Sequence, residues 1–293
     1  MYEEDEIRRL VRTALADLLA DQNHSGAASK PASPALTLVD DGFAPDVTAV
    51  TTKDEFHVPH PNDKDGYLAI KQSTVARLGV WRAGPRYNTW SLLHFRADHA
   101  TAQDAVFTDV PDEFVQQQGF IAGQSQCTSK DEFLTRPDLG RMLNEQTKTL
   151  FSQKLPKHAK VTLMVADGLS SAAMVNIPDI VPSIAQGLRG FGIELGPIPY
   201  VKYGRVGVMD DVGALIESDV ICLLIGERPG LATGESMSAY MAFQPNPSRP
   251  ESWRTVISNI YAGGTPPAEA GAHIATVLKR ILDERVSGVD LSM

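Results

Sequence analysis

The sequence of 293 residues has few of the features that mark secreted, membrane or nucleic-acid-binding proteins. It contains only two cysteines, Cys127 and Cys222, and the second lies in a strongly apolar run, so we expect unpaired thiols in a reducing compartment. No apolar run approaches the length of about 18 residues that a membrane helix needs, and the acidic N-terminus does not resemble a secretory signal. The net charge of -9 disfavours binding to nucleic acid or to an anionic membrane. We therefore expect a cytoplasmic protein.

Most short motifs that carry chemistry are also missing. The seven histidines do not show the spacing of a metal site, either among themselves or with cysteine. The two serines in "DGLSSA", Ser170 and Ser171, do not form the G-x-S-x-G turn of serine hydrolases. The glycines at 226, 230 and 234 do not match the G-x-G-x-x-G of dinucleotide-binding proteins, and a Walker lysine is absent. We therefore predict no metal site and no catalytic residue on this chain.

The N-terminal part of the sequence is predicted to be a helix joined to the rest by a linker. Apolar residues recur at three- and four-residue spacing between Glu3 and Asp21, which predicts an amphipathic helix over residues 1–22. The segment 23–66 includes "NHSGAASKPASP", a composition typical of flexible linkers. A helix tethered in this way either docks on a partner or remains a solvated tail, and the sequence leaves both alternatives open.

The remaining chain divides into a helical region and a region of alternating strands and helices. Residues 67–156 are predicted to be helical and loop-rich, with one helix running from Thr89 to Val106. In residues 157–293, helices are expected between the strands, including one over Glu235–Phe243. The alternation predicts an α/β fold, a Rossmann-like, mostly parallel sheet flanked by helices and preceded by a smaller helical region and the tethered N-terminal helix. The predicted strands are Lys160–Gly168, Gly192–Gly204, Val220–Gly226 and Thr255–Tyr261. The first, third and fourth are largely apolar rather than alternating, which predicts strands buried on both faces.

Each predicted strand ends in a loop that is rich in small residues. These loops read "ADGLSSAA", "YGRVGVMDD", "GERPGLATG" and "NIYAGGTPP". Parallel α/β sheets bind ligands beyond the carboxyl ends of their strands, where such loops meet. Glycines there would let the backbone approach a bulky ligand closely. The four loops together predict a ligand site at one edge of the sheet.

Two charged residues follow the most apolar of these strands, "VICLLIG". Glu227 and Arg228 would lie at a partly buried strand end, where a charge is costly unless it is paired or bound to a ligand. One interpretation is that each forms an ion pair with a neighbour such as Arg205 or Asp210. The other is that the carboxylate accepts amide hydrogens from a ligand while the guanidinium donates to ligand oxygens. The sequence alone does not decide between these two interpretations.

Five longer segments of the sequence resemble a known family. They are "RAGPRYNTWSLLHFRADHATAQDAVF", "DGLSSAA", "GRVGVMDDVG", "LLIGERPGLATGESMSAYMAF" and "VISNIYAGGTPP". Together they resemble the small subunit of ethanolamine ammonia-lyase, and the resemblance extends from about Tyr67 to the C-terminus. It implies a lyase that depends on adenosylcobalamin and converts ethanolamine to acetaldehyde and ammonia by a radical route.

The resemblance also implies a division of labour between two subunits. In this family the large subunit is a β/α barrel that holds ethanolamine and the catalytic residues, and the small subunit covers the cobalamin with its Rossmann-like domain. Residues 157–293 are therefore expected to cover the cobalamin, and residues 67–156 are expected to contact the large subunit. Only the hetero-oligomer of the two subunits is expected to be active. The N-terminal helix resembles the short tails that direct cargo into bacterial microcompartments, which makes contact with a microcompartment shell a further hypothesis.

Carried over to this sequence, the residues expected to bind the cofactor are Arg205, Val206, Glu227, Arg228 and Asn259. Cobalamin is a wide macrocycle edged with amides, so a glutamate can accept its N–H groups and arginines can donate to its carbonyl oxygens. Whether Asn259 or the adjacent Ser258 makes the contact on the last strand is left open. The alternative functions are a free-standing nucleotide-dependent oxidoreductase, against which the missing G-x-G-x-x-G argues, and an assembly protein whose glycine loops are only turns.

Overall fold

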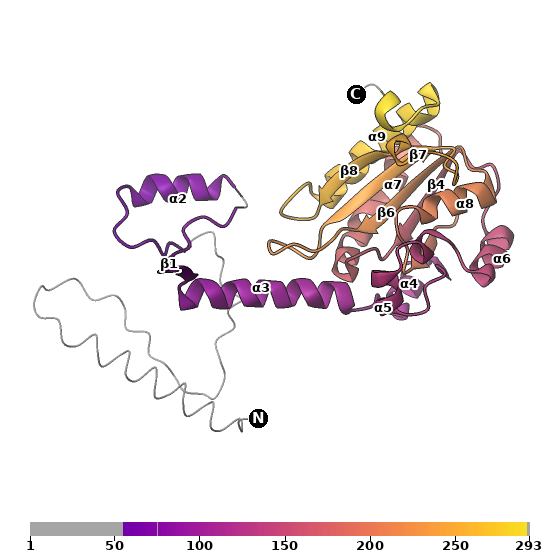
Figure 1. The fold of residues 1–293 in the computed structure, drawn as a ribbon. Helices are drawn as coiled ribbons and strands as arrows, with labels where there is room; N and C mark the ends of the chain where they lie inside the picture. The colour runs from indigo at the N-terminus through magenta and orange to yellow at the C-terminus, as the bar shows by residue number, and fades with distance from the viewer. Residues whose placement is uncertain (1–54, 75, 292–293) are drawn as a thin grey trace, which may run out of the picture. The chain divides into compact units, whose positions relative to one another are not determined.

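The computed structural model describes residues 55–74 and 76–291, whose fold is drawn in Figure 1. The helix predicted for residues 1–22 and most of the linker predicted for residues 23–66 lie outside these residues. The thiols of Cys127 and Cys222 are both free and buried, which confirms the expectation that they are unpaired. None of the helices in the described residues is both long and apolar enough to cross a lipid bilayer.

A six-stranded sheet forms the centre of the fold, with the strand order β3-β5-β4-β6-β7-β8. Strands β3, β5, β4 and β6 are parallel, β7 is antiparallel to β6, and β8 is antiparallel to β7. Strand β8 therefore runs in the direction of β6, so β4, β5, β6 and β8 all end at one edge of the sheet. The predicted α/β, mostly parallel fold is confirmed. The strands are β3 (Ile121–Gln124), β4 (Val161–Ala166), β5 (Pro199–Lys202), β6 (Val220–Gly226), β7 (Met237–Phe243) and β8 (Thr255–Ile260).

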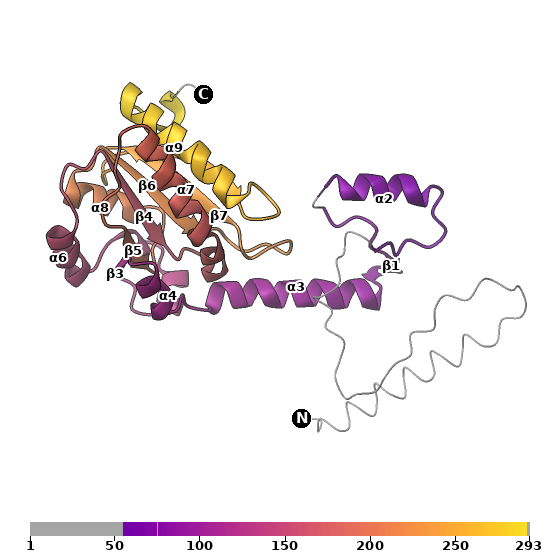
Figure 2. The same cartoon turned by 180° about the vertical axis from the view of Figure 1, so that it is seen from behind.

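Helices cover both faces of the sheet because successive side chains of its strands point to opposite faces. Leu163 and Val165 of β4 pack in one apolar cluster with α7 and α9, whereas Met164 packs in a second cluster with α6 and α8. The covering helices are α6 (Glu145–Lys154), α7 (Ile177–Gly190), α8 (Val208–Ile216) and α9 (Pro267–Glu284). Helices α7 and α9 lie side by side, as Figure 2 shows from behind.

The helix predicted for Glu235–Phe243 is wrong, because this segment forms β7. Its residues pair with β6 along the whole strand, from Gly226 opposite Met237 to Val220 opposite Phe243. Met237, Ala239 and Met241 pack on the α7–α9 face, and Ala242 packs on the other face. Both faces of the segment are largely buried, and Ser238 alone interrupts its apolar character, so it lacks the regular alternation that identifies a strand in a sequence.

Two further features of the sheet differ from the sequence prediction. The region 67–156 contributes β3, which pairs with β5 at one edge of the sheet, so this region is not only helical. The last strand, expected from its apolar sequence to be buried on both faces, is instead the other edge strand, and its Val256 is exposed. An edge strand has a neighbour on one side only, which leaves part of its surface to solvent.

The chain before the sheet is helical with a short hairpin. Helix α3 (Thr89–Phe107) confirms the helix predicted from Thr89 to Val106, and it begins where the Asn88 side chain accepts a hydrogen bond of 2.8 Å from the Ser91 backbone. The other elements are α2 (Lys64–Gln72), β1 (Arg82–Ala83), β2 (Arg86–Tyr87), α4 (Asp112–Gln117), α5 (Lys130–Thr135), and the 3-10 helices η3 (Leu139–Arg141), η4 (Ser171–Asn176), η5 (Glu251–Trp253) and η6 (Gly288–Asp290).

Candidate functional site

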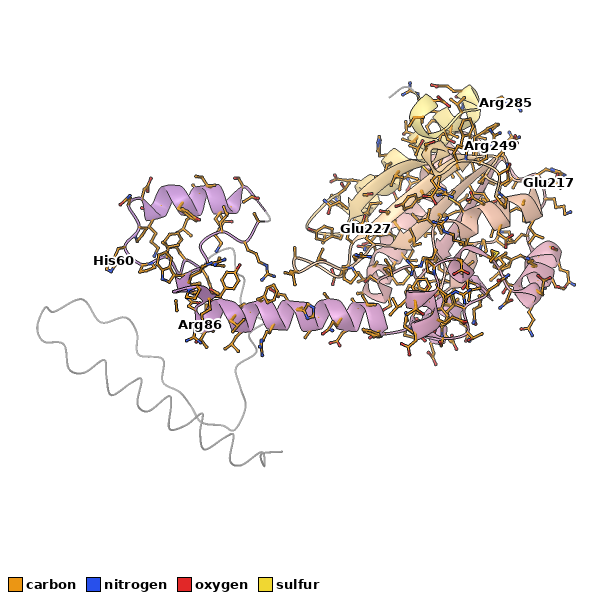
Figure 3. The ribbon with its side chains drawn as sticks, in the orientation of Figure 1. His60, Arg86, Glu217, Glu227, Arg249 and Arg285 are labelled. Atoms are coloured by element: carbon orange, nitrogen blue, oxygen red, sulfur yellow. The ribbon has the colours of Figure 1, made fainter. Side chains whose placement is uncertain are left out.

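A cavity of about 400 Å³ opens at the edge of the sheet where β4, β5 and β6 end. Figure 3 labels Glu227, which directly follows the last residue of β6. Glu217, also labelled, comes shortly before the first residue of β6, at the other end of the strand. Four of the five residues expected to bind the cofactor line this one cavity. The lining residues are Phe133, Gly168, Leu169, Gly204, Arg205, Val206, Ile225, Gly226, Glu227, Arg228, Ser238, Tyr240 and Ser258. The structure thus confirms that the loops after these strands meet around a shared concave surface.

The Glu227 carboxylate is held by β7, the residue before it, and β8 rather than by an ion pair. Its Oε2 accepts a hydrogen bond of 2.7 Å from the Ser236 hydroxyl, and its Oε1 accepts one of 2.6 Å from the Ser238 hydroxyl. The same Oε1 accepts a bond of 2.9 Å from the Asn259 backbone N–H. Three donors of the chain therefore compensate the cost of desolvating the carboxylate at the strand end.

Of the two interpretations that the sequence left open, the ion pairs of Glu227 and Arg228 with Arg205 or Asp210 are not formed in the described residues. Asp210 is instead paired with Arg254, and both side chains are nearly buried. Arg228 is exposed, lines the cavity, and makes no ion pair or hydrogen bond with any described residue. Its guanidinium is therefore available to a ligand.

The Arg205 guanidinium is partly committed to the protein. Its Nη2 donates a hydrogen bond of 2.7 Å to the Phe133 carbonyl oxygen, and its Cζ lies 4.6 Å from the centre of the Phe133 ring. The Nε of Arg205 is buried without a hydrogen-bond partner among the described residues. Burial lowers the pKa of this guanidinium, and the charges of Arg141 and Arg228 act in the same direction. An oxygen-rich ligand group would satisfy the donor and reduce this repulsion.

Asn259 and Ser258 have different places at the end of β8. Asn259 has a φ of 63°, and its backbone N–H and C=O both bond within the protein, to Glu227 and to the Thr265 N–H. Ser258 lines the cavity, whereas Asn259 does not. The structure thus brings Asn259 to the site through its backbone bond to Glu227, and the β8 side chain at the cavity wall is that of Ser258.

Sequence reasoning missed Asp167, which fixes the loop after β5. Its side chain is fully buried, and its two oxygens accept hydrogen bonds of 2.8 Å from the Tyr203 N–H and 3.1 Å from the Gly204 N–H. Burial raises the pKa of this carboxyl group to about 6, against the opposing effect of these hydrogen bonds. Arg205 and Val206 follow directly on the loop. The signal in the sequence is an acid placed directly after a largely apolar strand, "VTLMVA".

Two glycines at the cavity are required by contacts within the chain itself. A Cβ atom on Gly168 would lie 2.3 Å from the Gly226 carbonyl oxygen, and one on Gly226 would lie 2.2 Å from the Ser170 carbonyl oxygen. Such distances are far below van der Waals contact, so the loops after β4 and β6 can pass each other only if both of these residues are glycine. At these two positions the glycines serve loop packing, and the expected approach of the backbone to a ligand is not needed to explain them.

No group of three or more His, Cys, Asp or Glu side chains is placed to hold a metal ion within residues 55–74 and 76–291. The cavity instead combines apolar side chains such as Val206 and Tyr240 with the hydrogen-bonding groups described above. Surfaces of this kind bind ligands that have apolar faces and polar edges.

Comparison with known proteins identifies the family. Residues 64–292 match the family model described as ethanolamine ammonia-lyase light chain (EutC). The chain is 47% identical over 290 residues to the ethanolamine ammonia-lyase small subunit of Listeria innocua, covering 98% of this chain and 99% of the relative. It is 53% identical over 252 residues to that of Clostridium perfringens, covering 86% and 85%, and 46% identical over 296 residues to that of Clostridium tetani, covering 100% of both. The resemblance seen in the sequence is thereby confirmed, and the chain belongs to the family of ethanolamine ammonia-lyase small subunits.

Proposed function

We propose that this protein is the small subunit of an adenosylcobalamin-dependent ethanolamine ammonia-lyase and covers one side of the cofactor with the cavity at the end of its sheet. The catalytic residues for the conversion of ethanolamine to acetaldehyde and ammonia then lie on the large subunit. One observation carries the proposal. Arg205, Val206, Glu227 and Arg228, which the family resemblance assigns to the cofactor, line a single cavity.

The residues of the cavity fit one edge of an amide-rimmed macrocycle. Val206 and Leu169 provide apolar contact for the ring, and Arg228 has donors available for amide carbonyl oxygens. The buried Nε of Arg205 lacks a partner among the described residues and suits the same kind of oxygen. Glu227 and Ser258 present oxygens to amide N–H groups. A cavity of about 400 Å³ receives only part of so large a ligand, which agrees with a second subunit enclosing the remainder.

The cofactor, when bound, supplies the radical chemistry, and the protein supplies binding, orientation and exclusion of water. The residues of this chain would fix the rim of the macrocycle through hydrogen bonds and shield one of its sides. The matched family and relatives give no support to the alternative of a nucleotide-dependent oxidoreductase.

We also propose that residues 67–156 contact the large subunit. Helix α3 exposes several large apolar side chains along its length, and exposed apolar surface commonly marks a protein interface. These side chains are Leu93, Phe95 and Phe107.

For residues 1–22 we keep the proposal that they direct the protein to a microcompartment shell. Diffuse fluorescence from a fusion of residues 1–33 to a fluorescent protein, in a host that forms shells, would contradict it.

Reconstitution tests the proposed function. The purified chain should release no ammonia from ethanolamine, with or without adenosylcobalamin. Ammonia release should appear when the large subunit and adenosylcobalamin are both added, because the residues that act on ethanolamine are supplied by the large subunit. Activity of the isolated chain, or absence of activity in the complete mixture, would refute the proposed division of roles.

A further inference from the structure

Three side chains form a continuous hydrogen-bonded line from the end of β6 to the wall of the cavity. The Ser238 hydroxyl lies 2.6 Å from Oε1 of Glu227, and its oxygen lies 3.0 Å from the Ser258 hydroxyl oxygen. Ser238 is buried, with 3% of its surface exposed, whereas Ser258 is exposed and lines the cavity. The line therefore connects a carboxylate to a hydroxyl that a ligand can reach.

The direction of each hydrogen bond in this line follows from how many hydrogens its members have. An ionised carboxylate only accepts, so Ser238 must donate its single hydrogen to Glu227. The contact of 3.0 Å between the two serine oxygens is then a hydrogen bond only if Ser258 donates to Ser238. The opposite arrangement would leave two oxygen lone pairs facing each other at a buried atom, which is unfavourable.

The backbone N–H of Asn259 fixes this direction independently of charge. It donates to the same Oε1 of Glu227 that receives the Ser238 hydroxyl, and a backbone N–H cannot become an acceptor. The atom at the Oε1 position must therefore be an acceptor whatever residue carries it. A glutamine at position 227 would satisfy this with its oxygen and turn its NH2 group toward Ser236, whose hydroxyl can rotate to accept.

Ser258 is left with lone pairs and without a hydrogen to donate. Glu227 already receives three donors out of the roughly four lone-pair sites of a carboxylate. Ser258 is thus a second acceptor at the cavity wall, beside the one lone-pair site that remains on Glu227.

We propose that Ser258 is a specificity-determining contact that accepts hydrogen bonds only, and that it selects ligands with N–H donors at their rim. A primary amide can donate to it, whereas an ester of similar size presents only oxygens. The identity of the ligand rests on the proposed function. The inference adds that the cavity wall at Ser258 accepts N–H donors at the rim of the ligand, and that Glu227 and Ser238 impose this preference.

The test is a binding measurement on the assembled complex of this chain with its large subunit. The probes are cyanocobalamin and a series of its derivatives in which one side-chain amide at a time is replaced by the neutral methyl ester. Dissociation constants are read from the absorption spectrum without turnover. At least one ester should bind the wild-type complex about three- to tenfold more weakly than cyanocobalamin, the range that one lost hydrogen bond produces.

Three variants separate the oriented contact from simpler explanations. Ser258→Ala should abolish the discrimination against that ester because the acceptor is gone. Ser238→Ala should also abolish it, because the Ser258 hydroxyl can then turn and donate to the ester. Glu227→Gln should retain it, since the Asn259 N–H still fixes the direction. The matched control is Ser152→Ala, which removes an exposed hydroxyl on α6, a helix that does not line the cavity. This variant should still bind the ester more weakly than cyanocobalamin.

The outcomes distinguish this inference from the proposed function. Equal affinity of the wild-type complex for cyanocobalamin and every ester would overturn the inference alone. Discrimination that persists in Ser258→Ala or in Ser238→Ala would do the same, because the line would not be its cause. If the wild-type complex fails to bind cyanocobalamin at all, the proposed function falls, and the inference falls with it.

Discussion

At the residue scale, the buried Asp167 carboxyl group makes stability depend on pH. Its pKa is raised by burial from 3.8 to about 6. A group whose pKa is higher in the folded state than in the unfolded state stabilises the fold most below the lower pKa, and this contribution is lost as the pH rises through the higher one. The contribution of Asp167 should therefore decline between about pH 4 and pH 6.

The substitution Asp167→Asn isolates this effect. The variant should be less stable at every pH, because an amide cannot accept from both the Tyr203 and Gly204 N–H groups. The difference in free energy of unfolding between wild type and variant should widen by about 1 kcal/mol between pH 7 and pH 5. Urea denaturation of the purified chain measures it. Asp138→Asn is the control, since that carboxyl is exposed and its pKa is lowered. If the difference in free energy of unfolding between wild type and Asp167→Asn stayed constant from pH 7 to pH 5, Asp167 would not titrate in this window.

The site residues differ in how far the sequence could predict them. Glu227 and Arg228 stand out because they directly follow a strand that is apolar throughout, and both line the cavity. Asn259 was expected to contact the ligand, but the structure shows the contact of its backbone with Glu227. Ser258 and Asp167 acquire their roles from the loops and strands that fold against them, and no local pattern encodes those neighbours.

At the scale of elements, the sequence predicts β4 and β6 because each is a short apolar run ending at a glycine or an acid. It fails at β7 and β3 for different reasons. Strand β7 is buried along nearly its whole length and is as long as a short helix. Strand β3 has four residues, of which none is fully buried, so its place in the sheet comes from pairing with β5 rather than from its own sequence.

The packing of α7 against α9 provides a test at this scale. Gly187 lies at their contact, where an added Cβ would be 2.5 Å from the Ala275 Cβ of α9. Gly190 is in the same helix, and an added Cβ there meets nothing within 4 Å. Gly187→Ala should lower the free energy of unfolding by about 1–3 kcal/mol, the usual cost of overpacking.

Gly190→Ala is the matched control for this prediction. It should be neutral or should stabilise by up to about 1 kcal/mol, because it reduces the freedom of the unfolded chain without a clash. Thermal and urea denaturation of both variants provide the comparison. If the two substitutions had equal effects, the close approach of α7 and α9 at Gly187 would not be a feature of the folded protein.

At the scale of the whole molecule, the exposed apolar side chains of α3 test the proposed contact with the large subunit. Leu93 is 47% exposed and Phe95 is 40% exposed, so replacing both by serine should change the free energy of unfolding of the isolated chain by less than about 0.5 kcal/mol per site. The affinity for the large subunit should fall at least tenfold if the helix lies in the interface, since a few buried apolar residues dominate such contacts.

Val289→Ser is the control for the interface, because Val289 is 80% exposed in η6, near the C-terminus. This variant should bind the large subunit with the affinity of the wild type. Sedimentation or calorimetric titration with the purified large subunit measures the three affinities. Undiminished binding of the Leu93→Ser, Phe95→Ser variant would place the interface elsewhere.

The central claim is that the cavity at the end of the sheet holds one side of adenosylcobalamin, and its most direct test is cofactor titration of the assembled enzyme with Glu227→Ala. This change removes the acceptor of three donors, so the apparent Kd for adenosylcobalamin should rise about tenfold or more, while kcat at saturating cofactor changes little. The control Glu235→Ala, an exposed acid on the same loop, should leave the Kd unchanged. A Kd for Glu227→Ala equal to that of the wild type would contradict the account.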